Sequence, residues 1–169
     1  GRELSGIHFA MDYLVQSNKR VSGEKIPQDK AIDASGKKVV VIGGGDTGSD
    51  CIGTAIRQGA TCVVQLEILP KPPDKRHPEK FPWPSYPIIL KTSTSHEEGA
   101  DRHWSVSAKK FVGERGAVKK LVCYKADSAM KEIPGTEFDI DTDLVILAMG
   151  FVHPERHGPI DELGIGLDS

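Results

Sequence analysis

The chain has 169 residues, with 22 Lys or Arg against 24 Asp or Glu, so its formal net charge is −2. Hydrophobic residues make up 38% and glycines number 18, which excludes a disordered chain and a collagen-like repeat. The near-neutral charge also speaks against a general nucleic-acid binder, because such proteins need a basic surface to displace counterions from phosphates. We expect one domain, or one domain with pieces of a neighbour.

The compartment is suggested by apolar runs and cysteines. The longest stretch without a charged residue is 144–154, well short of the ~20 apolar residues of a membrane-spanning helix, and we see no signal peptide. Cys51, Cys62 and Cys123 are far apart and form no C-x-x-C motif. We therefore expect three buried, reduced thiols in a cytoplasmic protein. Because the first residue is Gly1 and not Met, we expect a piece of a longer protein.

The first half of the chain reads as a βαβ unit. Apolar residues with helical spacing predict a helix over residues 7–20, and a polar connector follows over 21–36. Four consecutive β-branched residues predict a buried strand over 38–42. A glycine-rich turn then leads into a predicted helix over 47–58 and a second strand over 62–69. Strand, turn, helix and strand in this order are typical of a parallel sheet.

The second half changes character. Residues 70–87 hold seven of the 11 prolines, which remove amide donors and so predict a semi-rigid surface loop. Farther on, Ser95 and Glu98 have the spacing of a helix capping box. Apolar residues then alternate with a period of two, which predicts an antiparallel meander over 103–140 and a last apolar strand over 143–147.

These elements together predict an α/β fold. We expect a Rossmann-like, three-layer FAD/NAD(P)-binding domain, with a parallel sheet and a small antiparallel β-meander. The domain should occupy residues 37–147. An N-terminal helix with its connector, residues 1–36, and a C-terminal segment, residues 148–169, should flank it.

The main chemical signal is the turn Gly43-Gly44-Gly45-Asp46-Thr47-Gly48, which fits G-x-G-x-x-G between a strand and a helix. In this motif Gly43 permits the tight turn, Gly45 lets the main chain approach a pyrophosphate, and Gly48 lets the helix pack on the strand. The amides at the helix start favour a diphosphate. The sequence therefore predicts a dinucleotide site here.

The two polar residues of the turn each have more than one candidate role. A carboxylate beside a pyrophosphate is costly, so Asp46 should face away, where it could cap the helix or bind an amide or a ribose hydroxyl. Thr47 could donate its hydroxyl to a phosphate oxygen or cap the helix.

The coenzyme preference stays open between NADPH and NADH. Glu67 follows Gly48 by about 20 residues, the spacing of the acid that binds the adenosine ribose and disfavours a 2′-phosphate. Lys71 and Arg76, with other basic residues of the proline-rich loop, could instead hold that phosphate. Alternatively, Glu67 and these basic residues are solvent-exposed charges that bind no ligand.

Other candidate sites are weaker. The stretch 96–103 contains metal-ligand residue types without metal-site spacing, so we interpret it as a solvated loop. Ser93 and His96 form no nucleophile elbow, so we expect no hydrolase chemistry. Trp83 and Trp104 are interpreted as packing residues rather than as stacking platforms.

Several segments resemble, in collinear order, the small (beta) subunit family of glutamate synthase. The wider architecture is similar to flavoprotein reductases that bind two dinucleotides, such as thioredoxin reductase and adrenodoxin reductase. The segments that carry the resemblance are GRELSGIHFAMDYL, GKKVVVIGGGDTGSDC, EILPKPP, STSHEEG and DLVILAMGFVHP.

The resemblance implies an oxidoreductase. Hydride would pass from NADPH or NADH to FAD, and electrons would continue through iron–sulfur clusters to FMN in the large (alpha) subunit, where glutamate is made. This chain would be the NAD(P)H-binding domain, joined to an FAD domain that lies outside it together with the clusters. Ala148, Met149 and Gly150 match the family segment near the nicotinamide, although Met149 replaces the threonine common in the wider class. No catalytic acid, base or nucleophile is assigned, and neither nucleic acid nor membrane is expected as a partner.

Two other interpretations remain open. The glycine turn could belong to FAD instead of NAD(P)H. Alternatively, the chain could be a non-catalytic dinucleotide-binding regulatory module, with the proline-rich loop and the meander as its interaction surface.

Overall fold

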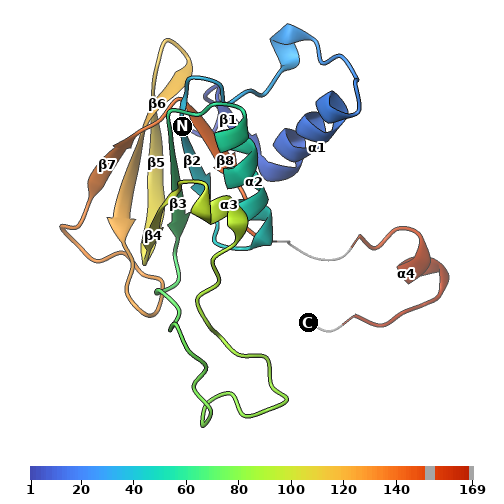
Figure 1. Ribbon diagram of the computed structural model, residues 1–169, viewed down its shortest axis with the longest axis vertical. Helices are drawn as coiled ribbons and strands as arrows, with labels where there is room; N and C mark the ends of the chain where they lie inside the picture. The colour runs from blue at the N-terminus through green and yellow to red at the C-terminus, as the bar shows by residue number, and fades with distance from the viewer. Residues whose placement is uncertain (151–154, 168–169) are drawn as a thin grey trace.

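The computed structural model describes residues 1–150 and 155–167, and its centre is a parallel sheet between two covering layers (Figure 1). The strand order of the five-stranded sheet is β1-β8-β2-β3-β4. Two helices cover one face and a three-stranded antiparallel sheet covers the other. The predicted α/β, Rossmann-like, three-layer fold is therefore confirmed. The elements are β1 (Ile7–Phe9), α1 (Ala10–Val21), η1 (Gln28–Lys30), β2 (Lys38–Ile42), α2 (Asp46–Arg57), β3 (Cys62–Glu67), α3 (Thr94–Glu97), β4 (Asp101–Trp104), β5 (Val106–Glu114), β6 (Ala117–Lys125), β7 (Phe138–Asp141), β8 (Leu144–Leu147) and α4 (Pro159–Glu162).

Side chains of the central strands alternate between two cores. Val39 and Val41 of β2 pack with Ile52 of α2 on the helix side. Val40 of β2 packs with Leu121 of β6 on the side of the antiparallel sheet. Because both faces of the sheet are covered, the strand needs apolar residues at every position, which explains its uninterrupted β-branched run.

The N-terminal helix begins later than predicted. Residues Ile7–Phe9 form a parallel edge strand beside β8, with Ile7 opposite Val145, so the prediction of a helix from residue 7 was wrong for these three residues. Val145 donates a 2.7 Å hydrogen bond to the carbonyl of Gly6. The open edge of β8 thus offers backbone partners that sequence periodicity does not reveal, and the helix starts at Ala10.

The boundary between the two sheets also differs from prediction. The segment Asp101–Trp104 is β4 of the parallel sheet, with His103 opposite Leu66 of β3, so the meander does not begin at residue 103. The chain turns at Ser105, which has a φ of +54°, and the antiparallel sheet starts at Val106. β4 lies at the edge of the parallel sheet and lacks the uninterrupted apolar run of the central strands, which is why the pattern did not separate it from the antiparallel sheet.

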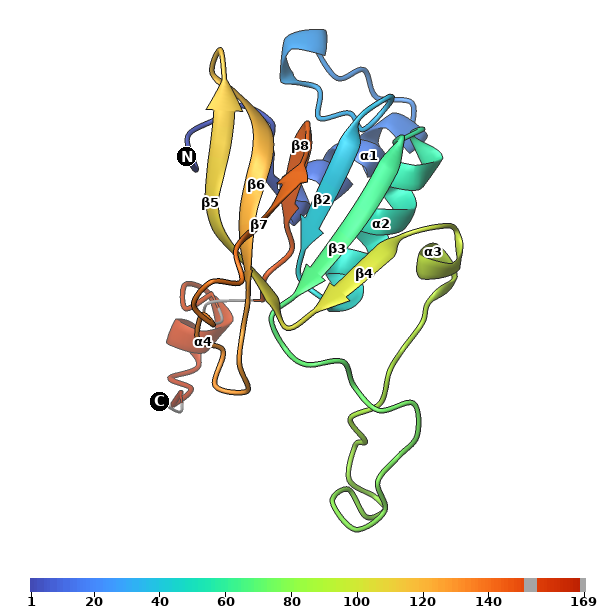
Figure 2. The ribbon, with the colours of Figure 1, turned by 90° about the vertical axis from the view of Figure 1, so that its left-hand side faces the viewer.

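The proline-rich loop leaves the edge where β2, β3 and β4 end (Figure 2). Its two limbs are joined by a 2.8 Å hydrogen bond from Leu90 N–H to the Pro73 carbonyl. Trp83 lies in this loop with 84% of its surface exposed, so its interpretation as a packing residue was wrong. The loop extends away from the sheet (Figure 2) and, within the described part of the chain, contributes no residue to either hydrophobic core.

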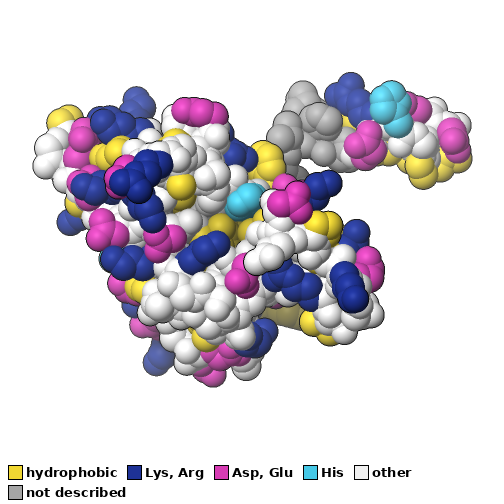
Figure 3. All heavy atoms as spheres, turned by 90° about the horizontal axis from the view of Figure 1, so that it is seen from above, with side chains coloured by type: hydrophobic (Ala, Val, Ile, Leu, Met, Phe, Trp, Pro, Cys, Tyr) yellow, Lys and Arg dark blue, Asp and Glu magenta, His cyan; other side chains and the backbone are white. Residues whose placement is uncertain are grey.

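The remaining features of the fold are the charges on its surface and the burial of its three cysteine thiols. Side chains of both charges are interspersed on the face shown in Figure 3. Within the described residues, no helix combines the length and apolar character needed to cross a bilayer. Cys51 and Cys123 are buried, and burial raises the pKa of each thiol to about 12. Cys62 is exposed, contrary to prediction, because it stands at the first position of β3, before the strand enters the core.

Candidate functional site

The glycine turn lies at a point where the sheet connections diverge. It follows β2, which lies between β3 and β8 in the sheet. Along the chain, β3 is the next strand of this sheet and β8 is its last strand. In open α/β sheets, ligands bind at the carboxyl ends of the strands where the strand order reverses in this way. The fold therefore brings Gly43–Gly48 to a position suited to a ligand.

The glycines of the turn differ in what requires them. Gly43 has a φ of +129°, and a Cβ there would lie 2.1 Å from the carbonyl oxygen of Ala148. A Cβ on Gly48 would lie 2.4 Å from the carbonyl oxygen of Gly43, so this glycine lets α2 pack against the turn. By contrast, a Cβ on Gly45 would meet nothing within 4 Å. Packing explains Gly43 and Gly48, whereas Gly45 leaves open space from which a ligand can approach the main chain.

Glu67 lies directly beside the turn. Its Oε2 would be 2.1 Å from a Cβ on Gly44, so Gly44 makes room for this carboxylate. Its Oε1 accepts a 3.0 Å hydrogen bond from the Leu69 N–H. The acid is half-buried and fixed at the end of β3, where a ribose hydroxyl would meet it in a bound dinucleotide.

The first turn of α2 has no side-chain cap. Gly45 holds the N-cap position, and the helix begins at Asp46. Neither Asp46 nor Thr47 makes a side-chain hydrogen bond to the described residues, so neither plays the capping role that the sequence left open. The first amides of a helix have no intrahelical partner. Those of α2 are therefore available to an anion outside the chain.

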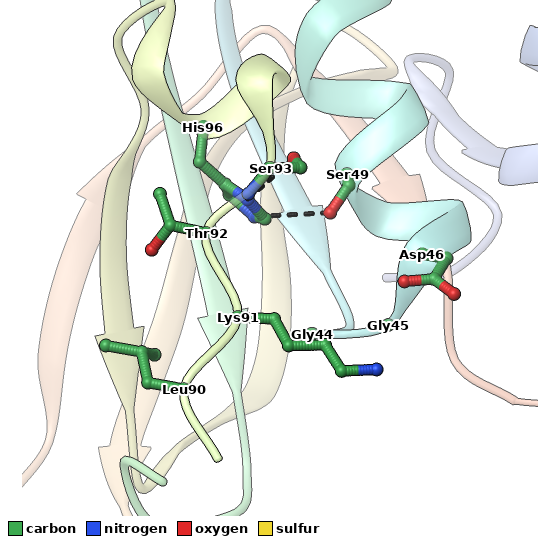
Figure 4. Close-up of a pocket in the computed structure, with 9 residues that line it drawn as sticks. All are labelled: Gly44, Gly45, Asp46, Ser49, Leu90, Lys91, Thr92, Ser93 and His96. Atoms are coloured by element: carbon green, nitrogen blue, oxygen red, sulfur yellow. Dashed lines mark hydrogen bonds between the residues drawn. The ribbon is translucent and has the colours of Figure 1, made fainter. Parts of the chain in front are cut away.

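A cavity of about 750 Å³ opens between the glycine turn and residues 90–96 (Figure 4). Its first wall is the turn and the start of α2, and its second wall comes from the end of the proline-rich loop and from α3. The lining residues are Gly44, Gly45, Asp46, Ser49, Leu90, Lys91, Thr92, Ser93 and His96. A neighbouring cavity of about 280 Å³ shares Gly44 and Gly45 and extends past Glu67 to β4.

Lys91 is a cation of this cavity that the sequence did not single out. It lines both cavities, and Figure 4 shows its side chain reaching toward Gly44 and Gly45. Its ammonium group donates a hydrogen bond to the hydroxyl of Tyr86 and lies 4.8 Å from the centre of that ring. The hydrogen bond raises the pKa of Lys91. A positive charge is thus held opposite the uncapped helix.

His96 belongs to the second wall of the cavity. The prediction that it lies in a solvated loop was wrong. The imidazole is buried, and its Nδ1 accepts a 3.0 Å hydrogen bond from the Ser93 N–H in a capping box of α3. The predicted box of Ser95 and Glu98 was wrong because α3 begins two residues earlier. Burial and the nearby charge of Arg102 lower the pKa of His96 and so disfavour its charged form. Because Nδ1 accepts from the Ser93 N–H, the proton of the neutral ring lies on Nε2.

Gln65 connects the two walls. Its Nε2 donates a 2.9 Å hydrogen bond to the carbonyl of Gly43. Its Oε1 accepts hydrogen bonds of 3.1 Å from His96 Nε2 and from Arg102 Nε. The only signal in the sequence was a polar residue within the apolar run CVVQLE, and it was missed.

The two predicted cations of the proline-rich loop take other positions. The Lys71 ammonium lies 5.4 Å from the centre of the Trp104 ring, at the outer side of the smaller cavity. Arg76 donates hydrogen bonds of 2.7 Å and 2.6 Å to the carbonyls of Phe81 and Ser85. The structure therefore does not bring Arg76 to either cavity.

Ala148, Met149 and Gly150 follow β8 on the other side of the turn. The Ala148 N–H donates a 2.8 Å hydrogen bond to the Ile42 carbonyl. Met149 is 60% exposed. These residues adjoin Gly43 and lie away from Glu67, so the predicted residues divide between the two sides of β2. Among the described residues, no group of three His, Cys, Asp or Glu side chains is arranged to hold a metal ion.

The sequence has relatives among glutamate synthases, although no family model matches the chain. It is 47% identical to a glutamate synthase (NADPH) small chain of Mycobacterium tuberculosis, over 98% of this chain and 35% of the relative. It is 41% identical to a glutamate synthase (NADH) of Schizosaccharomyces pombe, over 92% of this chain and 8% of the relative. A Bacillus subtilis small chain is 36% identical, over 92% and 34%. The resemblance is confirmed, and the chain spans about a third of the length of these small chains.

Solved structures support the fold. A thioredoxin reductase of T. acidophilum superposes with a TM-score of 0.52 at 18% identity, over 86% of this chain and 36% of that one. A FAD-dependent pyridine nucleotide-disulphide oxidoreductase of Desulfovibrio vulgaris gives 0.51 at 18% identity, over 88% and 31%. At this identity the likeness concerns the architecture alone.

Proposed function

We propose that this chain is the NAD(P)H-binding domain of a glutamate synthase small subunit. It would hold reduced nicotinamide in position for hydride transfer to an FAD bound by neighbouring sequence. The observation that carries the proposal is the glycine turn, where Gly45 and the uncapped start of α2 border a cavity of about 750 Å³. The similarity to NADPH- and NADH-named glutamate synthases supports the same function.

Each part of the site has a distinct binding role in this proposal. The amides at the start of α2 hold the diphosphate, and Lys91 adds a positive charge from the opposite wall. Glu67 accepts hydrogen bonds from the adenosine ribose. The nicotinamide half extends in the other direction, toward Ala148–Gly150. When bound, the coenzyme supplies the hydride, and the residues of this chain bind and orient it without acting as acid or base.

The proposed domain organisation is supported by the length of the relatives. The small chains that resemble this chain are about three times as long, which supports an FAD domain outside it. We propose residues 37–147 as the coenzyme-binding domain, with residues 1–36 and 148–169 as the connections to the FAD domain. Of the second connection, residues 151–154, 168 and 169 lie outside the described residues. Iron–sulfur clusters, a large-subunit partner and a cytoplasmic location belong to the same proposal.

Calorimetric titration of the chain with NADPH and NADH tests the proposed function. We expect the purified chain to be colourless, to release or absorb heat with reduced coenzyme, and to show competition by 2′,5′-ADP. Absence of both heat and competition would refute the proposal. A yellow protein whose flavin absorption survives desalting would assign the glycine turn to FAD instead.

A further inference from the structure

We infer that Arg102 selects a coenzyme that carries a phosphate on the adenosine 2′-oxygen. The sequence offers Lys71 and Arg76 as candidates for this role, whereas the structure places a different cation, Arg102, in the cavity that Glu67 lines. The inference rests on the proposed function, because it needs a dinucleotide on the glycine turn.

The first argument concerns position. In the parallel register, Gln65 of β3 lies opposite Arg102 of β4, and Glu67 lies opposite Trp104. Residues two apart on a strand share a face of the sheet, so these four side chains lie on the same face. The cavity of about 280 Å³ runs from Gly44 past Glu67 to Arg102 and Trp104. A ribose at Glu67 would therefore have β4 as its next neighbour along the sheet edge.

The second argument concerns charge. The Arg102 guanidinium is half-buried and donates to Gln65 Oε1 and to the Lys91 carbonyl, each at 3.1 Å. It also lies 4.9 Å from the centre of the Trp104 ring. Within residues 1–150 and 155–167, no carboxylate oxygen lies within 4.0 Å of it. Arg57, by contrast, pairs with Glu98. Arg102 is thus a partly desolvated cation with neutral partners.

These partners leave Arg102 prepared for an anion. Two of its five N–H groups are used by Gln65 and Lys91, and stacking on Trp104 fixes the plane of the group. A guanidinium held in this way binds a phosphate with little further loss of side-chain entropy. Burial lowers the pKa of Arg102 from its high ordinary value, and the group remains charged at neutral pH.

The cations of the proline-rich loop are less suited to the same phosphate. Arg76 is bound to two carbonyls of its own loop and lines neither cavity. Lys71 contacts Trp104 from outside the lining of the smaller cavity. Glu67 and Arg102 instead border the same cavity, which offers an acid for a ribose hydroxyl and a cation for a phosphate on the adjacent oxygen.

Dissociation constants of NADPH and NADH for the wild-type chain, Arg102→Gln and Arg76→Gln test the inference, with 2′,5′-ADP and 5′-ADP as the matched fragments. We expect the wild type to prefer NADPH. Arg102→Gln should weaken NADPH and 2′,5′-ADP by about 10- to 100-fold, the range of one charge-assisted contact. It should change NADH and 5′-ADP by less than about threefold. Arg76→Gln should change neither the ratio of the NADPH and NADH dissociation constants nor that of 2′,5′-ADP and 5′-ADP.

Three results would overturn the inference. Arg102→Gln could weaken both coenzymes equally, which would mean that Arg102 only supports Gln65 and the turn. Arg76→Gln could produce the selective loss, or the wild type could prefer NADH. If Arg102→Gln fails to fold, Arg102→Lys serves in its place and should retain part of the NADPH preference. If the wild type binds neither coenzyme, the proposed function fails as well, which distinguishes that outcome from the other three.

Discussion

The two walls that enclose the adjoining cavities are built in different ways. One is main chain, the turn Gly43–Gly48, and its shape is fixed by contacts among Gly43, Gly48 and Ala148. The other consists of side chains from residues 90–104, which a long loop brings into place. The comparison suggests a division of labour in which backbone holds the diphosphate that all dinucleotides share. In the proposed complex, side chains would recognise the ribose substituents by which the coenzymes differ.

The largest effects should come from the main-chain wall. Gly43→Ala forces a Cβ against the Ala148 carbonyl at a φ of +129°, so we expect the free energy of unfolding to fall by about 3 kcal/mol or more. Chemical denaturation measures this loss. Wild-type stability in this variant would show that packing does not fix the turn.

Gly45→Ala is the matched control, because its Cβ meets open space. We expect a stability loss of about 1 kcal/mol or less. Coenzyme affinity should nevertheless fall by at least about 10-fold, because the methyl group occupies the approach to the main chain. Calorimetry with NADPH and NADH checks both constants. Unchanged affinity would mean that the ligand does not approach the turn here.

Lys91→Gln probes the shared cation of the side-chain wall. Because the Lys91 side chain reaches toward Gly44 and Gly45 (Figure 4), where the diphosphate is expected, its loss should weaken NADPH and NADH alike, by about 10-fold at low salt. Lys80→Gln, an exposed position of the same loop, controls for a general change in charge. An effect on NADPH alone would place Lys91 at the 2′-phosphate and contradict the assignment.

Glu67→Ala addresses the ribose. The carboxylate accepts from ribose hydroxyls in the proposed complex, so NADH should bind several-fold more weakly. NADPH should be affected less, because the same change removes repulsion of its extra phosphate. Titrations of the wild type and of Glu67→Ala give the change in dissociation constant for each coenzyme. Equal changes for both coenzymes would show that Glu67 supports the turn and does not bind the ribose hydroxyls.

The smallest effect concerns pH. The pKa of His96 lies below its ordinary value of 6.5 in the folded chain, so the unfolded chain binds more protons as pH falls through about 6.5. Stability should therefore decrease between about pH 7 and pH 5. His96→Gln removes this contribution, and its melting temperature should depend less on pH, by a few degrees over that range.

His8 provides the comparison for this prediction. Its pKa is also lowered, mainly by burial, but it lies on the edge strand β1, away from the cavity. Each substitution should remove its own part of the pH dependence. A melting profile of His96→Gln that runs parallel to the wild-type profile would contradict the buried, neutral imidazole.

The main-chain wall could be predicted from the sequence because its determinants are local. A β-branched run, a glycine turn and an amphipathic helix follow one another over residues 38–57, and each forms where the pattern indicates it. Glu67 also lies beside the turn, as its spacing suggests. Local sequence determines these features because neighbouring residues supply the backbone geometry of the turn, although Gly43 also packs against the distant Ala148.

The side-chain wall could not be predicted because it depends on distant partners. Gln65 is paired through the register of β3 with β4, and β4 itself was assigned to the wrong sheet. His96 and Lys91 reach the cavity only because the loop folds back after residue 87. The edge strand β1 was missed for the same reason, since its partner β8 lies more than 100 residues away along the chain.

A crystal structure of the chain soaked with NADPH tests directly whether the main chain holds the diphosphate and side chains contact the ribose. We predict the diphosphate within hydrogen-bond distance of the amides at the start of α2, close to Gly45, with Lys91 opposite it and the adenosine ribose at Glu67. A coenzyme bound elsewhere, or a glycine turn that stays closed by its own packing at saturating NADPH, would contradict the proposed site.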